Sequence, residues 1–137
     1  MKPDHILETC LYAADLNAAE AFYRDVLGLE PVTKAQGRHV FYRFKDQMLL
    51  IFNPKATQVA SAPDAKIPML PHGAIGPGHI CFRASAAEID TWRARLIEKG
   101  VEIEADFIWP GGGRSIYFRD PANNCLEFAE SRIWGIA

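Results

Sequence analysis

Three polar residues, Glu8, His79 and Glu127, stand in segments whose other residues are mostly apolar or typical of β-strands. A carboxylate among apolar strand residues is costly unless it is paired or bound to a cation. Two carboxylates and an imidazole that converge on one point offer the oxygen and nitrogen ligands that a divalent metal prefers. We therefore interpret Glu8, His79 and Glu127 as metal ligands that leave positions open for water or substrate. The alternative for each is a surface group on an open sheet face, and for His79 a structural histidine.

An internal repeat is the reason for grouping these residues. The sequence GRHVFYR at residues 37–43 returns as GRSIYFR at residues 113–119, and the similarity extends in both directions. Such a repeat indicates two copies of one structural unit. When the copies are aligned, Glu8 pairs with His79 and Ile51 pairs with Glu127, so three of four related positions carry a possible ligand.

The elements that position these residues are expected to be one strand, one helix and three strands in each copy. Asp15 fits an N-cap, and Ser85 with Glu88 forms the S-x-x-E capping box of a second helix. Strands are expected at residues 5–13, 29–34, 38–44, 48–53, 79–84, 101–108, 114–119 and 125–129, and the first helix at residues 16–27. Residues 54–77 hold five of the nine prolines and are expected to form a linker or surface loop, long enough for a lid.

Side chains alternate along a strand, so residues two apart share a face. Glu8 and His79 are expected on faces turned away from the helices, with Tyr12 and Arg83 further along the same strands. Tyr12 could donate a hydrogen bond to a substrate. Arg83 could bind an anionic substrate or lie at the rim in water. The same faces carry the three cysteines, Cys10, Cys81 and Cys125. We interpret them as small apolar residues that line a pocket, with a redox or ligand role as the alternative.

Composition excludes several classes of protein. The chain has 137 residues, of which 49% are hydrophobic, and a formal net charge of −2, so it can bury a core. It has no basic stripe for nucleic acid and no apolar run of membrane-spanning length. The N-terminus lacks the apolar core of a signal peptide, and the cysteines form no C-x-x-C pattern, so we expect a cytoplasmic protein with reduced thiols.

These motifs also carry a family resemblance. The chain resembles the vicinal oxygen chelate superfamily, which includes glyoxalase I, extradiol dioxygenases and bleomycin-resistance proteins. The resemblance rests on Asp15-Leu16 with residues 21–28 (AFYRDVLG), on GHICF at 78–82, and on YFRDP at 117–121 with Asn124 and Leu126-Glu127. It implies an α+β fold in which two tandem βαβββ modules form a curled mixed sheet around a cavity. One glyoxalase-like domain would then span residues 1–137, with module one at about 5–53, a linker at 54–77 and module two at about 78–130.

The resemblance places metal ligands at His79 and Glu127, whereas the first module departs from the family pattern. Glu8 stands where a histidine is usual, with His5 as an alternative ligand if a bulge intervenes. Ile51 stands where glyoxalase I has a carboxylate, which argues against ordinary glyoxalase I activity. Two carboxylates and one histidine favour Mn or Fe, with Zn also possible. The resemblance further implies a homodimer.

Two functions follow. One is an enzyme whose divalent metal binds two neighbouring oxygens of a small substrate, with Glu8 as a candidate general base, as in a lyase, dioxygenase or transferase of this superfamily. The other is a metal-free protein, similar to bleomycin-resistance proteins, that binds a drug or antibiotic in an apolar cavity.

Overall fold

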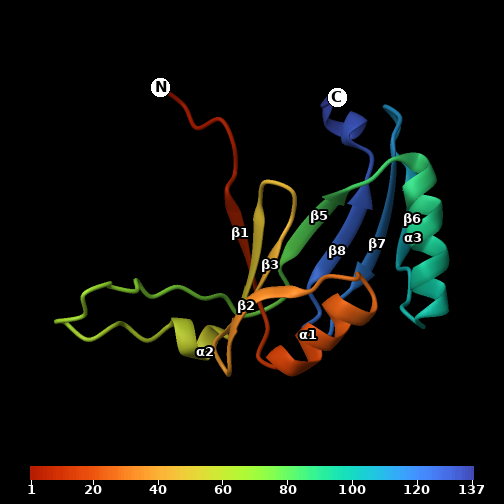
Figure 1. The fold of residues 1–137 in the computed structure, drawn as a ribbon. Coiled ribbons are helices and arrows are strands. Elements are labelled where there is room, and N and C mark those ends of the chain that lie inside the picture. The colour runs from red at the N-terminus through yellow and green to blue at the C-terminus, as the bar shows by residue number, and fades with distance from the viewer. The chain divides into compact units, whose positions relative to one another are not determined.

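The computed structural model describes residues 1–137, and its elements follow in the predicted order (Figure 1). The first copy contains β1 (Glu8–Tyr12), α1 (Leu16–Asp25), β2 (Pro31–Ala35), β3 (His39–Arg43) and β4 (Met48–Phe52). The second contains β5 (His79–Arg83), α3 (Ala86–Glu98), β6 (Ala105–Ile108), β7 (Arg114–Arg119) and β8 (Cys125–Ala129). A short helix α2 (Pro54–Thr57) and a 3-10 helix η1 (Ser131–Trp134) complete the chain. The repeated βαβββ order is confirmed.

Each copy builds its own four-stranded mixed sheet. The strand orders are β1-β4-β3-β2 and β5-β8-β7-β6. In both sheets the first strand runs parallel to the last strand of its copy, while the other pairings are antiparallel. The fold class is α+β, as predicted, and neither sheet closes into a barrel because each keeps two edges.

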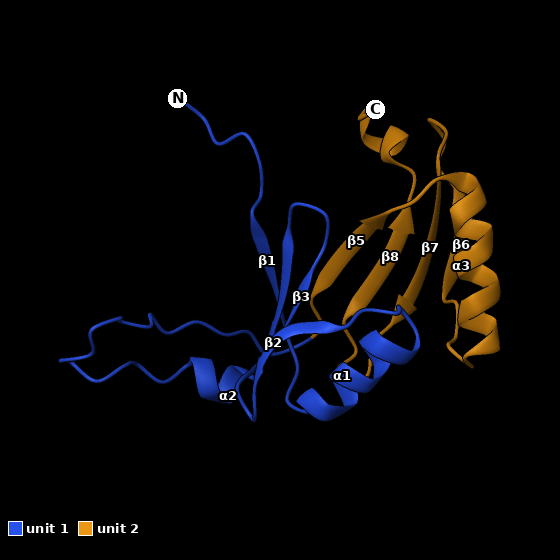
Figure 2. Cartoon of the chain, viewed as in Figure 1, with its two compact units in different colours: residues 1–76 blue, residues 77–137 orange.

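The chain divides into two compact units, Met1–Gly76 and Pro77–Ala137 (Figure 2). The boundary falls at the end of the proline-rich segment, so most of that segment belongs to the first unit. Its opening residues form α2, which Asn53 caps by accepting from the amide of Lys55 at 3.1 Å.

The helices begin where the sequence predicts. The Asp15 carboxylate accepts from the amide of Ala18 at 2.9 Å. Ser85 and Glu88 form the complete capping box at the start of α3. Gly28 and Gly100, which follow the two helices, both have φ of 71°, a conformation that glycine adopts without strain.

Two strands begin three or more residues later than the sequence predicts. β1 begins at Glu8, three residues after the expected start, and β6 begins at Ala105 instead of Val101. The amide of Val101 donates to the carbonyl of Leu96 at 2.9 Å and closes the end of α3, so this residue is not available for the sheet. Strand ends are set by pairing partners, which the local pattern does not reveal.

Each sheet packs one face on its helix. In the first unit Tyr23 of α1 stacks on Tyr42 of β3, with ring centroids 5.4 Å apart and both side chains fully buried. In the second unit Trp92 of α3 stacks on Phe128 of β8 at 4.5 Å. The opposite faces are therefore the ones that can carry functional groups. None of the helices has the length and apolar character needed to cross a membrane.

Candidate functional site

The second unit places His79 and Glu127 on one face of its sheet. In the register of β5 and β8, His79 lies opposite Cys125 and Cys81 lies opposite Glu127. The neighbouring residues Ile80 and Phe128 point the other way, toward α3. The predicted face assignment is confirmed for this strand pair.

His79 and Glu127 come within reach of each other. Nε2 of His79 lies 3.4 Å from Oε2 of Glu127. The other ring nitrogen, Nδ1, lies 3.0 Å from the carbonyl oxygen of Cys125. A carbonyl only accepts, so Nδ1 must donate and, in a neutral ring, Nε2 then carries a lone pair. Two electron-rich atoms therefore face each other, and a proton or a metal cation between them satisfies both.

Glu127 is the buried member of the pair. Its residue exposure is 4%, and Oε1 is buried without a hydrogen-bond partner. Burial and interaction with the Glu127 carboxylate raise the pKa of Tyr117 to about 12. Burial, and then the same carboxylate, raise the pKa of the Cys81 thiol to about 12. Both neighbours therefore stay protonated at neutral pH, and neither supplies positive charge to this carboxylate.

This donor set fits a divalent cation. A buried carboxylate oxygen without a partner is costly unless something binds it. An imidazole held through Nδ1 by a backbone carbonyl presents Nε2, an arrangement frequent among metal-bound histidines. A nitrogen and an oxygen 3.4 Å apart match two ligands that each lie about 2.1 Å from one ion.

The first unit carries Glu8 on β1, followed on the same face by Cys10 and Tyr12. Glu8 is exposed, and no ion pair holds its carboxylate. His5, the alternative ligand, is also exposed and precedes β1. No group of three or more His, Cys, Asp or Glu side chains that could hold a metal occurs in the structure. The structure thus brings together His79 and Glu127, while the addition of Glu8 to them stays a prediction.

The repeat alignment needs one correction. Ile51 of β4 lies opposite Leu11, is fully buried and belongs to the helix-covered face. Leu50 lies opposite Cys10, as Glu127 lies opposite Cys81, so Leu50 is the residue related to Glu127. The alignment of Ile51 with Glu127 was therefore wrong. The cause is the turn before the last strand, which is one residue longer at 120–124 than at 44–47. The related position is apolar in either case.

Tyr12 and His72 form a contact that sequence reasoning missed. The Tyr12 hydroxyl lies 2.7 Å from Nδ1 of His72, whose ring also packs against Phe52 with centroids 4.7 Å apart. The amide of His72 donates to the carbonyl of Thr57, which ties the loop to α2. No local signal places His72, because its partners are at least fifteen residues away along the chain.

Arg83 on β5 and Tyr117 on β7 are two further polar residues of the second sheet. Arg83 follows Cys81 on the face of His79, is exposed and forms no ion pair. It remains available to an anion, in line with one of its two predicted roles. Tyr117, which the sequence analysis overlooked, lies directly opposite Glu127 in the β7–β8 register. Alternation from the GRSIYFR motif identifies it once that register is known.

The two βαβββ modules, each with its own four-stranded mixed sheet, define the class of fold. The family model described as Glyoxalase/Bleomycin resistance protein/Dioxygenase superfamily matches residues 2–128. The chain belongs to this superfamily.

Solved structures support the assignment. A lactoylglutathione lyase from Agrobacterium tumefaciens is 47% identical, with 99% of this chain and 100% of that chain covered and a TM-score of 0.91. A glyoxalase-related enzyme from Fulvimarina pelagi shares the fold, with 22% identity, 98% and 94% coverage and a TM-score of 0.73. A superfamily protein from Nocardioides shares it too, with 23% identity, 95% and 85% coverage and a TM-score of 0.72. None of the curated proteins compared with the chain matches it.

Proposed function

We propose that the protein is a metal-dependent enzyme that binds two neighbouring oxygens of a small substrate, with Glu8, His79 and Glu127 as metal ligands. The observation that carries the proposal is the His79–Glu127 pair at 3.4 Å, in which Oε1 of Glu127 is buried without a partner. Mn, Fe or Zn suits a set of two carboxylates and one imidazole. When bound, the ion would polarise the substrate oxygens and stabilise the negative charge that develops on them.

The chain's own residues have separate tasks in this proposal. The Cys125 carbonyl holds the His79 ring in one orientation through Nδ1. Arg83 offers its unpaired guanidinium to an anionic group of the substrate. The Tyr12 hydroxyl lies 2.7 Å from Nδ1 of His72 and can donate its hydrogen to a substrate oxygen when Nδ1 carries a proton and donates to the hydroxyl. Glu8, exposed and without an ion pair, is the candidate general base, a role it could take when released from the metal.

The candidate substrate classes are a dicarbonyl adduct, a catechol-like compound and an epoxide. The relative from A. tumefaciens bears the name lactoylglutathione lyase, which makes that activity the first to assay. The apolar residue Leu50 at the position related to Glu127 leads us to expect a different substrate. A turnover number near that of a dedicated lactoylglutathione lyase would contradict this expectation.

A metal-free binding protein is the second candidate. It is favoured by the ring cluster on the open face of the first sheet, where His39 stacks on Phe41 at 4.0 Å and Phe52 contacts Phe41 at 5.1 Å. A flat aromatic ligand could pack against such a surface. In this case a proton, and not a metal, lies between His79 and Glu127.

Metal content separates the two candidates. The protein should be purified without chelator and without nickel affinity, and its metals measured by mass spectrometry. We expect close to one equivalent of a transition metal, lost in His79→Ala and Glu127→Gln and reduced in Glu8→Gln. Glu30→Gln, which removes another exposed carboxylate of the first unit, is the matched control and should keep the metal. Metal-free protein that still binds hydrophobic ligands favours the second candidate.

A further inference from the structure

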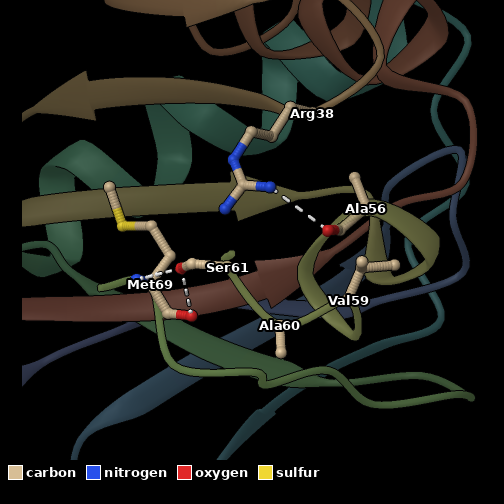
Figure 3. Close-up of a pocket in the computed structure, with 6 residues that line it drawn as sticks. All are labelled: Arg38, Ala56, Val59, Ala60, Ser61 and Met69. Atoms are coloured by element: carbon tan, nitrogen blue, oxygen red, sulfur yellow. Dashed lines mark hydrogen bonds between the residues drawn. The ribbon is translucent and has the colours of Figure 1, made fainter. Parts of the chain in front are cut away.

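A hollow of about 230 Å³ lies in the first unit, and none of the predicted metal ligands lines it (Figure 3). It lies between the start of β3 and the segment that follows α2. The residues that line it are Arg38, Ala56, Val59, Ala60, Ser61 and Met69. Four of the lining side chains are apolar, and the polar groups include the Arg38 guanidinium, the Ser61 hydroxyl and the Ala56 carbonyl.

The Arg38 guanidinium has unused donors in this hollow. Nη1 donates to the carbonyl of Ala56 at 3.1 Å, and no carboxylate forms an ion pair with this arginine. A guanidinium has five N–H donors, so four remain for other acceptors. Ser61 is occupied, because its hydroxyl accepts from the Met69 amide and donates to the Met69 carbonyl at 3.0 Å. Arg38 is therefore the group in the lining that is free to bind a ligand.

The second copy of the repeat shows how a related arginine is satisfied. Arg114 stands where Arg38 stands in the GRxxxxR motif, and it pairs with Asp106 at 2.8 Å and Asp90 at 2.6 Å. In the strand registers, Lys34 lies opposite Val40 as Asp106 lies opposite Ile116. The first copy thus has a lysine where the second has the carboxylate partner. Lys34 itself pairs with Glu20 at 3.0 Å and contributes no anion to Arg38.

We propose that this hollow binds a small carboxylate with a short apolar group. The carboxylate replaces the missing aspartate at Arg38 through a charge-assisted, bidentate contact. The apolar group contacts Val59 and Met69. A volume of about 230 Å³ exceeds the roughly 30 Å³ of one water in the liquid and admits a few carbon atoms. This inference is independent of the proposed enzymatic function.

The test is a titration of ¹⁵N-labelled protein with sodium butyrate, followed by chemical-shift changes in the NMR spectrum. We expect saturable shifts at the residues that line the hollow. Arg38→Gln should weaken binding at least about tenfold, the effect of losing one charge-assisted contact. Val59→Glu places a competing carboxylate at an exposed rim position and should also abolish binding. Thermal unfolding verifies that both variants fold.

Lys55→Gln is the matched control, since it removes an exposed positive charge next to Ala56 and leaves the guanidinium intact. Its butyrate affinity should stay within about twofold of the wild type. Equal losses in Arg38→Gln and Lys55→Gln would mean a general charge effect and overturn the proposal. So would binding of inorganic phosphate or 1-butanol as tight as that of butyrate, because the first lacks the apolar group and the second lacks the charge.

Discussion

Glu127 acts together with burial to keep two neighbouring side chains protonated. Its carboxylate lies beside the Cys81 thiol and the Tyr117 hydroxyl, and the pKa of each is raised to about 12. Partial burial is the first cause in both cases; next come hydrogen bonding with Glu127 for Tyr117 and the negative charge of Glu127 for Cys81. Cys81 therefore exists as a thiol at neutral pH, which agrees with the interpretation of the cysteines as small apolar residues and not as nucleophiles.

This protonation state predicts slow alkylation of Cys81. In metal-free protein the iodoacetamide reaction of Cys81 should rise with pH only well above 9, since the thiolate is the reactive form. Glu127→Gln removes the like charge, so the pKa falls and the rate at pH 9 increases several-fold. Mass spectrometry of labelled peptides gives the rate for each cysteine separately. A half-maximal rate near pH 8.5, the value of a free cysteine, would contradict the prediction.

Among the helices, α3 shows a clear link between sequence and stability. Ser85 caps the helix, and the Glu88 carboxylate accepts a hydrogen bond from the amide of Ser85 at 2.7 Å. The helix holds Trp92, Ile89 and Leu96 against the sheet that carries His79 and Glu127. The sequence predicted this element well because a capping box acts over three residues and needs no distant partner.

Loss of the Ser85 cap should therefore lower the free energy of unfolding. Ser85→Ala is expected to lower the free energy of unfolding by about 1 kcal/mol. Thr91→Ala, on the exposed side of the same helix, serves as the control and should change it by less than about 0.5 kcal/mol. Urea denaturation followed by circular dichroism measures both. An equal effect of the two substitutions would rule out a special role for the cap.

The strand β4 shows where the local pattern fails. All of its last four residues are buried, so alternation of burial gives no sign of which side chain faces which layer. The pairing with β1 places Ile51 under α1 and Leu50 next to the exposed Cys10. The register thus separates two neighbouring residues that the sequence presents as alike.

This difference can be measured. Ile51→Glu buries a carboxylate under the helix and should destabilise the protein by roughly 3 kcal/mol or more. Leu50→Glu places the charge on the opposite face, where it can reach water, and should cost at least about 1 kcal/mol less. Urea unfolding of both variants at pH 8 gives the comparison. A larger loss for Leu50→Glu would restore the original alignment of Ile51 with Glu127.

Across the whole chain, the two units have the same topology and different chemistry. The second unit carries His79 and Glu127 together, whereas the first carries Glu8 on the corresponding strand and apolar Leu50 opposite Cys10. The arginines of the repeated motif differ in the same way, because Arg114 is paired with two aspartates and Arg38 with none. At each of these positions one copy has a side chain that could bind a ligand, and the other copy does not.

We also expect the protein to form a homodimer in solution. Members of the superfamily that the chain resembles are expected to build their cavities partly across a subunit boundary. Light scattering after gel filtration should give about twice the chain mass of 15.3 kDa. A monomer at micromolar concentration that retains its metal would contradict this expectation.

The sequence by itself determined the repeat, the order of elements, both helix starts and the common face of His79 and Glu127. These features depend on alternation, capping and self-similarity, all of which act over a few residues. The tertiary structure decided the register of β4, the contact between His72 and Tyr12, and the lack of a carboxylate partner for Arg38. These depend on hydrogen bonds and contacts between distant segments, whose partners a local pattern does not specify.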